Sequence, residues 1–470
     1  MVVAPAKYAR IGYNWPSSMT VQIPMNQALP PVLRSDLSDL VQQTLAEATR
    51  QGADAAETRA SCASGLSVNV RLGAVDTLEQ HQDKALHVSV YIRHCQGSAS
   101  SSDFSPGAIR DTVRAACTIA RHTSADEFAG LVDAGDLTSK IPELGLDHPW
   151  LLDSGQAIAL ASACEAAALA RDPRIHNSDG AGVSSLRSQS AYGNSHGFIG
   201  GWCGTRHGID CTVLAEDASG KQRDFSYDLR RAAQELRKPA ALGLEAADRS
   251  LRRLGARQVP TGTYPVIFEA RAAGSLFGHF LSAISGGSIY RKSSFLLDQL
   301  GQAVFPDWMH IHEQPHLRGA LGSAPFDADG VATRAQDFVT GGRLRSWVLS
   351  GYSARRLGLH TTGNAGGVHN LCIDSNAGDL PQLLRRMDRG LLVTELMGFG
   401  VNAVTGDYSR GASGFWIEDG EIAWPVEEIT IAGNLRDMFL RIQAAGDDIE
   451  TRGNIRCGSI LLESMAVAGS

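Results

Sequence analysis

The feature that most constrains the fold is the order of two periodicities along the chain. Residues 65–103, "GLSVNVRLGAVDTLEQHQDKALHVSVYIRHCQGSASSSD", alternate polar and apolar side chains, which predicts about four short strands joined by Gly or Gln-Asp turns. A glycine-rich meander is predicted over 175–216. Helical patterns form separate runs at 35–52, 105–123 and 154–172. Because strands and helices are segregated, the sequence predicts an α+β fold rather than a doubly wound sheet.

The chain has 470 residues, enough for two or three domains. Residues 1–30 are predicted to form a loose arm with little strand. A basic stretch at 250–265, "SLRRLGARQVPTGTYP", is predicted to be helical and closes the first half of the chain. We therefore predict an N-terminal α+β domain over 31–240 and a β-rich C-terminal domain over 241–470.

Charge and cysteine usage exclude several kinds of partner. The formal net charge is −7 and no block of lysine and arginine occurs, which argues against nucleic acid as the main partner. No apolar run approaches the roughly 20 residues that a membrane-spanning helix needs, and the N-terminus lacks the apolar core of a signal peptide. The eight cysteines are scattered without a C-x-x-C pair, as in a protein with reduced thiols. We expect a cytoplasmic protein that binds neither nucleic acid nor membranes.

The segment "HIHEQPH" at 310–316 contains the zinc-peptidase pattern H-E-x-x-H. That chemistry requires His312 and His316 one helical turn apart, with Glu313 beside the metal-bound water. Pro315 opposes it, because a proline inside a helix removes a hydrogen bond and costs about 3 kcal/mol. A polar loop is therefore predicted. A zinc site built from His312, His316 and another group stays open as an alternative.

Two glycine-rich segments, "TTGNAGGVHN" at 361–370 and "GDYSRGASGFW" at 406–416, predict loops whose backbone approaches a ligand closely. Their polar side chains suit recognition of a peptide backbone or a carboxylate. Tight turns between strands are the simpler interpretation of both segments. The candidate substrate-binding residues are Asn364, His369, Asp407, Tyr408 and Arg410.

The apolar stretch "AGSLFGHFLSAI" at 273–284 follows a strand-like "TYPVIF" and predicts a helix with a single histidine, His279. A lone histidine on such a helix is usually a core residue rather than a ligand. Cys457, in "NIRCGSILL", has the pattern of a small buried apolar residue.

Long strings of the sequence resemble the TldE/PmbA family, whose members were once labelled modulators of DNA gyrase. The resemblance covers nearly all of the chain after the arm. In the first half it rests on "SVNVRLGAVDTLE" and "GSASSSDFSPGAIRDTVRAA". In the second half it rests on "LFGHFLSAISGGSIYRKSSFLLDQLG", "GYSARRLGLHTTGNAGGVHN", "LLVTELMGFGVNAVTGDYSRGASGFW", "PVEEITIAGNLRDMF" and "DIETRGNIRCGSILL".

The resemblance implies a two-protein zinc metallopeptidase that cleaves unfolded or modified peptides, as in peptide-antibiotic maturation and antitoxin degradation. In the TldD-like partner, zinc is held by an H-E-x-x-x-H helix and a cysteine near the C-terminus. Laid on this chain, the motif places Gly274 and Ser275 at the first histidine and the glutamate. His279 keeps the second histidine and Cys457 the cysteine. The resemblance thus implies a vestigial metal helix in the C-terminal domain, because glycine cannot act as a metal ligand and serine cannot act as the general base in place of glutamate.

The resemblance therefore implies a non-catalytic chain with no cofactor of its own, while zinc sits on the TldD-like partner. The chain would line the chamber that receives the peptide substrate, and it would form a homodimer when the partner is missing. Two alternatives remain. One is an autonomous metallopeptidase that uses His312 with His316, or His279 with Cys457. The other is a protein-binding modulator without a peptidase role.

Overall fold

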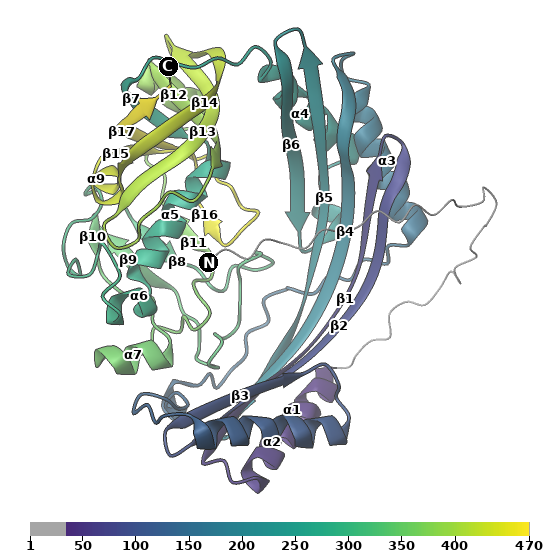
Figure 1. Cartoon of the computed structure of the whole chain (residues 1–470), viewed down its shortest axis with the longest axis vertical. Helices are drawn as coiled ribbons and strands as arrows, with labels where there is room; N and C mark the ends of the chain where they lie inside the picture. The colour runs from purple at the N-terminus through teal and green to yellow at the C-terminus, as the bar shows by residue number, and fades with distance from the viewer. Residues whose placement is uncertain (1–33, 470) are drawn as a thin grey trace. The chain divides into compact units, whose positions relative to one another are not determined.

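A computed structural model describes residues 34–469 of the chain (Figure 1). The arm predicted at 1–30 lies outside these residues. Within the described part, three β-sheets are combined with nine α-helices. The α+β class predicted from the segregated periodicities is therefore confirmed. The boundary predicted between 240 and 241 stays a prediction.

The first sheet is antiparallel throughout and has the strand order β3-β2-β1-β4-β5-β6 (Figure 1). The prediction of about four short strands over 65–103 is wrong, because the strands here are longer and fewer. Gln82, expected in a turn, stays in the β1–β2 ladder opposite Ser64. The chain reverses at Leu72-Gly73, one of the predicted Gly turns, and at Arg93-His94, and the positive φ angles of both pairs suit tight hairpin turns. The bounds are β1 (Ala55–Arg71), β2 (Ala74–Ile92), β3 (Cys95–Ser101), β4 (Ile175–Asn194), β5 (Ile199–Asp217) and β6 (Gly220–Arg230).

Helices cover this sheet in two pairs, one toward each end of the long strands (Figure 1). α1 (Arg34–Arg50) and α2 (Pro106–His122) pack on one part of the sheet, and α3 (Ser154–Leu169) and α4 (Pro239–Arg252) on another. α2 starts as predicted, since Ser105 Oγ accepts a hydrogen bond from the N–H of Ala108 at 3.3 Å. The helical runs predicted at 35–52, 105–123 and 154–172 are confirmed. The helix predicted at 250–265 is wrong, because α4 ends at Arg252 and a strand begins at Gly262.

The C-terminal half contains two more sheets. One has the order β10-β9-β8-β11-β16, and the other runs β14-β13-β12-β7-β17-β15, with an additional β14–β17 pairing that closes five of its strands into a ring. The strands of these two sheets are, in chain order, β7 (Gly262–Phe268), β8 (Ile311–Glu313), β9 (Gln336–Thr340), β10 (Arg343–Leu344), β11 (Leu371–Ile373), β12 (Gly390–Met397), β13 (Asp407–Glu418), β14 (Glu421–Asn434), β15 (Ile442–Ala445), β16 (Ile455–Arg456) and β17 (Ile460–Ala468).

Helix α5 (Ala270–Ile284) packs into the largest apolar cluster of the described residues. Phe280 on this helix meets Phe305 at 5.1 Å between ring centroids, and Phe305 stacks on Phe439 at 4.9 Å. The remaining helices are α6 (Gly286–Tyr290), α7 (Gly351–Leu357), α8 (Leu380–Met387) and α9 (Leu435–Leu440), with short 3-10 turns at Ala134–Asp136 and Ala233–Glu235. Among the helices of residues 34–469, none has the length and apolar character to cross a membrane.

Candidate functional site

Helix α5 is fixed at its N-terminus by charged and polar side chains. Glu269, the residue before the helix, accepts two hydrogen bonds from the Arg249 guanidinium on α4, at 3.1 and 3.3 Å. The backbone N–H of Ala270 donates to Ser459 Oγ at 3.0 Å, and this hydroxyl donates to Asp448 at 2.6 Å. Because the Arg249 and Glu269 side chains are only 12% and 16% exposed, this ion pair sets where α5 begins relative to α4.

The faces of α5 differ in what they contact. The face around Phe277 is buried in the C-terminal core. Another face carries Gly274, Ser275, Gly278 and His279, all of them partly exposed. A Cβ atom added to Gly274 or Gly278 would meet no atom within 4 Å. The position where the resemblance places the first zinc histidine therefore borders open space.

His279 lies against side chains of strand β13. Its ring stands edge-on to that of Tyr408, with 6.0 Å between centroids and 78° between planes. Arg410 is two residues further along the strand, so its side chain leaves the same face as Tyr408. The structure thus brings together His279, noted on the helix, and two of the residues predicted to bind substrate.

Three buried polar atoms of this cluster have no hydrogen-bond partner among the described residues: His279 Nε2, the Tyr408 hydroxyl and Arg410 Nε. Burial, and then the charge of Arg410, lower the pKa of His279, so its imidazole is neutral near pH 7. Burial raises the pKa of Tyr408 to about 12, although the nearby Arg410 opposes it. Unsatisfied buried groups cost roughly 1–3 kcal/mol each. Such a cluster suits a ligand group that offers hydrogen-bond acceptors, such as a peptide carbonyl or a carboxylate.

The residues on and near α5 do not fit a catalytic zinc ion, which needs three protein ligands and a place for water. Gly274 has no donor atom, and the Ser275 hydroxyl donates to the carbonyl of Ala272 at 2.7 Å. Cys457 is fully buried, and burial together with nearby carboxylates raises the pKa of its thiol. A free thiolate nucleophile needs the opposite shift, whereas a metal ion deprotonates the thiol that binds it. The alternative pairing of His279 with Cys457 stays a prediction.

The "HIHEQPH" segment forms a strand followed by turns. The expectation that it is not a helix is confirmed, but the predicted loop is wrong at Ile311–Glu313. These residues form β8, which pairs with β9 on one side and β11 on the other. Two neighbouring strands supply the tertiary context that the local sequence does not reveal.

Glu313 is 1% exposed and accepts hydrogen bonds from strand β9 and from the loop at 361–370. Its carboxylate accepts from Asn364 Nδ2 at 2.9 and 3.0 Å and from Gln336 Nε2 at 2.7 Å, and it lies 3.1 Å from His369 Nδ1. Asn364 and His369 are therefore engaged by an interior carboxylate. Their predicted contact with substrate stays a prediction.

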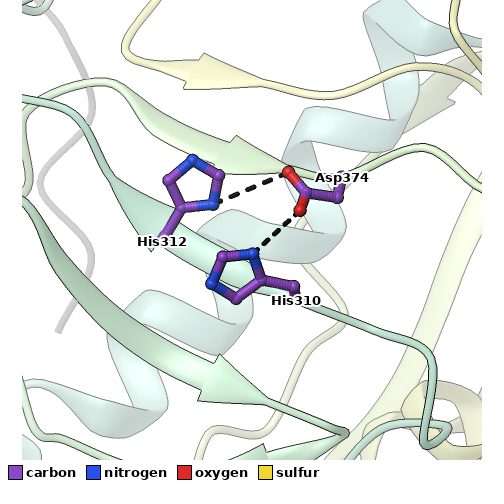
Figure 2. A group of neighbouring side chains, drawn as sticks. All are labelled: His310, His312 and Asp374. Carbon is purple, nitrogen blue, oxygen red and sulfur yellow. Dashed lines mark hydrogen bonds and ion pairs between the residues drawn. The ribbon is translucent and has the colours of Figure 1, made fainter.

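His312 and His316 face different partners. His316 Nε2 lies 2.9 Å from Thr333 Oγ1, whereas His312 stacks on His310, with 4.5 Å between ring centroids. Figure 2 shows both His310 and His312 turned toward Asp374. The structure thus brings His312 together with His310 and Asp374 rather than with His316, its partner in the alternative zinc site, and sequence reasoning missed this group. The H-x-H spacing on a strand was its only local signal, since Asp374 is remote in the chain.

The segment at 406–416, predicted as a loop, lies largely inside strand β13. Its glycines allow close strand contacts, since a Cβ on Gly414 would lie 1.8 Å from the Leu392 carbonyl oxygen. Asp407 begins the strand in an exposed position and accepts hydrogen bonds from Thr405 Oγ1 at 2.6 Å and Asn434 Nδ2 at 3.2 Å. The prediction of a loop is wrong for this segment, because its glycines lie in a strand and allow close packing against the neighbouring strand.

Family models and curated relatives that match this chain all belong to one family. Models of the PmbA/TldA metallopeptidase match domain 1 at 56–120, the central domain at 147–254 and the C-terminal domain at 261–469. Metalloprotease PmbA of Escherichia coli O157:H7 is 49% identical over 88% of this chain and 92% of its own length. A PmbA homolog of Haemophilus influenzae is 44% identical over 94% and 98%.

Solved structures agree with this fold. A Bacteroides thetaiotaomicron protein described as a modulator of DNA gyrase superposes with a TM-score of 0.87 at 26% identity, covering 92% of this chain and 98% of its own. TldE from Thermococcus kodakarensis superposes with a TM-score of 0.77 at 19% identity, covering 93% and 100%, and shows the same fold. The chain therefore belongs to the PmbA/TldD family of metallopeptidases.

Proposed function

We propose that this chain is the non-catalytic subunit of a heteromeric zinc metallopeptidase whose zinc is held by a TldD-like partner. The observation that carries the proposal is the open face of α5. Gly274 and Ser275 stand where the metal ligand and general base would be, and no neighbouring side chain fills the space. The similarity to a TldD homolog of Buchnera aphidicola, 22% identical over 51% of this chain, supports a pair of related subunits.

The cluster of His279, Tyr408 and Arg410 is the proposed contact to substrate. Its neutral imidazole, its phenol and its guanidinium offer donors to the carbonyl or carboxylate groups of an unfolded or modified peptide. The chain would hold the peptide while the partner supplies the metal-bound water. Peptide-antibiotic precursors and antitoxins are the substrates that the family resemblance favours.

The test uses the reconstituted pair with two matched variants. Replacing the partner's first zinc histidine with alanine should abolish peptide hydrolysis. His279→Ala in this chain should leave the rate at saturating peptide within a few-fold and raise KM. If His279→Ala instead abolishes turnover at every peptide concentration and removes bound zinc, the chain supplies a catalytic ligand and the proposal is wrong.

An autonomous peptidase has weaker support. β8 keeps His312 on a strand, and the Cys457 thiol is buried with a raised pKa. A protein-binding modulator would need a partner surface but no substrate cluster, so unpartnered polar atoms around His279 favour the peptidase subunit over it. All eight cysteines are free thiols, which supports a cytoplasmic location.

A further inference from the structure

A group of imidazole and carboxylate side chains gathers on one face of the sheet that contains β8. His310 and His312 are two residues apart on this strand segment, and Asp374 directly follows β11, the antiparallel neighbour of β8 (Figure 2). His310 Nδ1 lies 2.8 Å from Asp374 Oδ2, and His312 Nδ1 lies 3.6 Å from Asp374 Oδ1. One ligand atom from each residue falls within 4.8 Å of the others.

These separations are those of a metal-ligand set. Zinc–nitrogen and zinc–oxygen bonds of roughly 2.1 Å in a tetrahedral site place neighbouring ligand atoms roughly 3.4 Å apart. Both His Nδ1 atoms face the same carboxylate, and their distances to it of 2.8 and 3.6 Å lie on either side of that spacing. Asp374 is 53% exposed, so an ion can reach the group from solvent.

Two further observations distinguish this group from an ordinary surface cluster. His310 Nε2 lies 2.9 Å from Asp337 Oδ1 on β9, the orientation in which a carboxylate fixes the ring of a metal-binding histidine. His312 Nδ1 is buried and has no hydrogen-bond partner among residues 34–469, since 3.6 Å from Asp374 is too long. One histidine is thus oriented by a second carboxylate, and the other directs a free nitrogen toward the shared oxygen atoms.

We propose that His310, His312 and Asp374 bind one divalent transition-metal ion of the zinc class, with Asp337 positioning His310. Two imidazoles and a carboxylate are the donor set that zinc and its neighbours accept, whereas calcium and magnesium prefer oxygen ligands alone. The ion would join β8, β9 and β11 at a place separate from α5. The site does not depend on the proposed subunit role, because it uses none of the residues around His279.

The test is a Zn²⁺ titration of the full chain by calorimetry, with Co²⁺ absorption as a second readout of ligand geometry. We expect one ion per chain. Asp337→Asn should weaken binding about 10–100-fold, as loss of an outer carboxylate does, and His312→Ala and Asp374→Asn should weaken it further. His316→Ala is the matched control and should bind as the unaltered chain does, because this histidine bonds Thr333 instead.

The variants separate three possible results of the zinc titration. Equal affinity in the unaltered chain and Asp374→Asn overturns the site, and this variant stays informative if His312→Ala does not fold, since Asp374 is largely exposed. No binding by the unaltered chain would leave a hydrogen-bonded His–Asp cluster that only ties strands together. Binding that is lost in His279→Ala, and kept in His312→Ala, would place the ion at α5 and contradict the proposed function as well.

Discussion

The ring of His279 on α5 stands edge-on to Tyr408 on β13, with 6.0 Å between the centroids. The family resemblance implies a zinc helix with a first histidine five residues before this one, where this chain has Gly274. Here its neighbours are a phenol and the Arg410 guanidinium, and burial, followed by the charge of Arg410, lowers the pKa of His279. In the proposed function, these side chains act as hydrogen-bond donors that hold a peptide, while the partner supplies the Lewis acid.

Arg410 offers the strongest test of substrate binding. In the reconstituted pair, Arg410→Ala should raise KM for peptide about 10–100-fold, because charge-assisted hydrogen bonds contribute about 1.5–3 kcal/mol. Arg410→Lys should recover part of the loss. Arg385→Ala, on an exposed position of α8, serves as a control and should have no effect. Unchanged KM in Arg410→Ala would remove this cluster from the substrate path.

The open space beside Gly274 predicts a gain in stability. Gly274→Ala should raise the free energy of unfolding by about 0.5–1 kcal/mol, because alanine favours a helix interior and its Cβ meets no atom within 4 Å. Gly243 on α4 is the matched control, since its Cβ would lie 2.0 Å from the Cys164 carbonyl oxygen. Gly243→Ala should lower stability by about 1–3 kcal/mol in the same urea titration. A loss of stability in Gly274→Ala would mean that the space is filled.

Glu313 distinguishes a structural carboxylate from a catalytic one. Glu313→Ala should lower the free energy of unfolding by about 3 kcal/mol or more, because Asn364 and Gln336 lose a buried charged partner. Activity of the reconstituted pair, normalised to folded protein, should change little. Equal stability with lost activity would instead support the H-E-x-x-H hypothesis for His312, Glu313 and His316.

The parts of the fold that were predictable depend on contacts close in the sequence. Ser105 and Pro106 specify the start of α2 through local hydrogen bonding, and the strand before α5 and α5 itself follow from uninterrupted apolar patterns. The strand around Gln82 was missed because turn-forming residues there are overruled by pairing with β1 along its whole length. Local propensity does not report such tertiary pairing.

In the candidate site, too, the sequence indicates individual residues but not the tertiary contacts between them. His279, Tyr408 and Arg410 were each singled out from the sequence, yet only the packing of α5 on the sheet brings them together. His310 and Asp374 were missed because 64 positions separate them and β8 pairs with β11. A pattern with helical spacing drew attention to His316, which the strand geometry directs elsewhere.

Asp327 predicts a pH dependence of stability. Burial, and then the nearby charge of Asp329, raise the pKa of Asp327 to about 6 in the folded protein, from 3.8. Between these values the folded state holds the proton more firmly than the unfolded state, so this group's contribution to stability falls as pH rises from about 4 to 6 and is constant above. In Asp329→Asn, the pKa of Asp327 should move down and this fall should shrink. Urea unfolding at a series of pH values measures it, and an identical slope in both proteins would contradict the assignment.

The most direct measurement of the central claim is peptide hydrolysis by the isolated chain saturated with zinc, followed by addition of the TldD-like partner. We expect no hydrolysis above the metal-only background before the partner is added, even if His310, His312 and Asp374 have bound an ion, and full activity afterwards. Turnover by the zinc-loaded chain alone, lost when His279 or His312 is replaced, would contradict it and make this chain a peptidase in its own right.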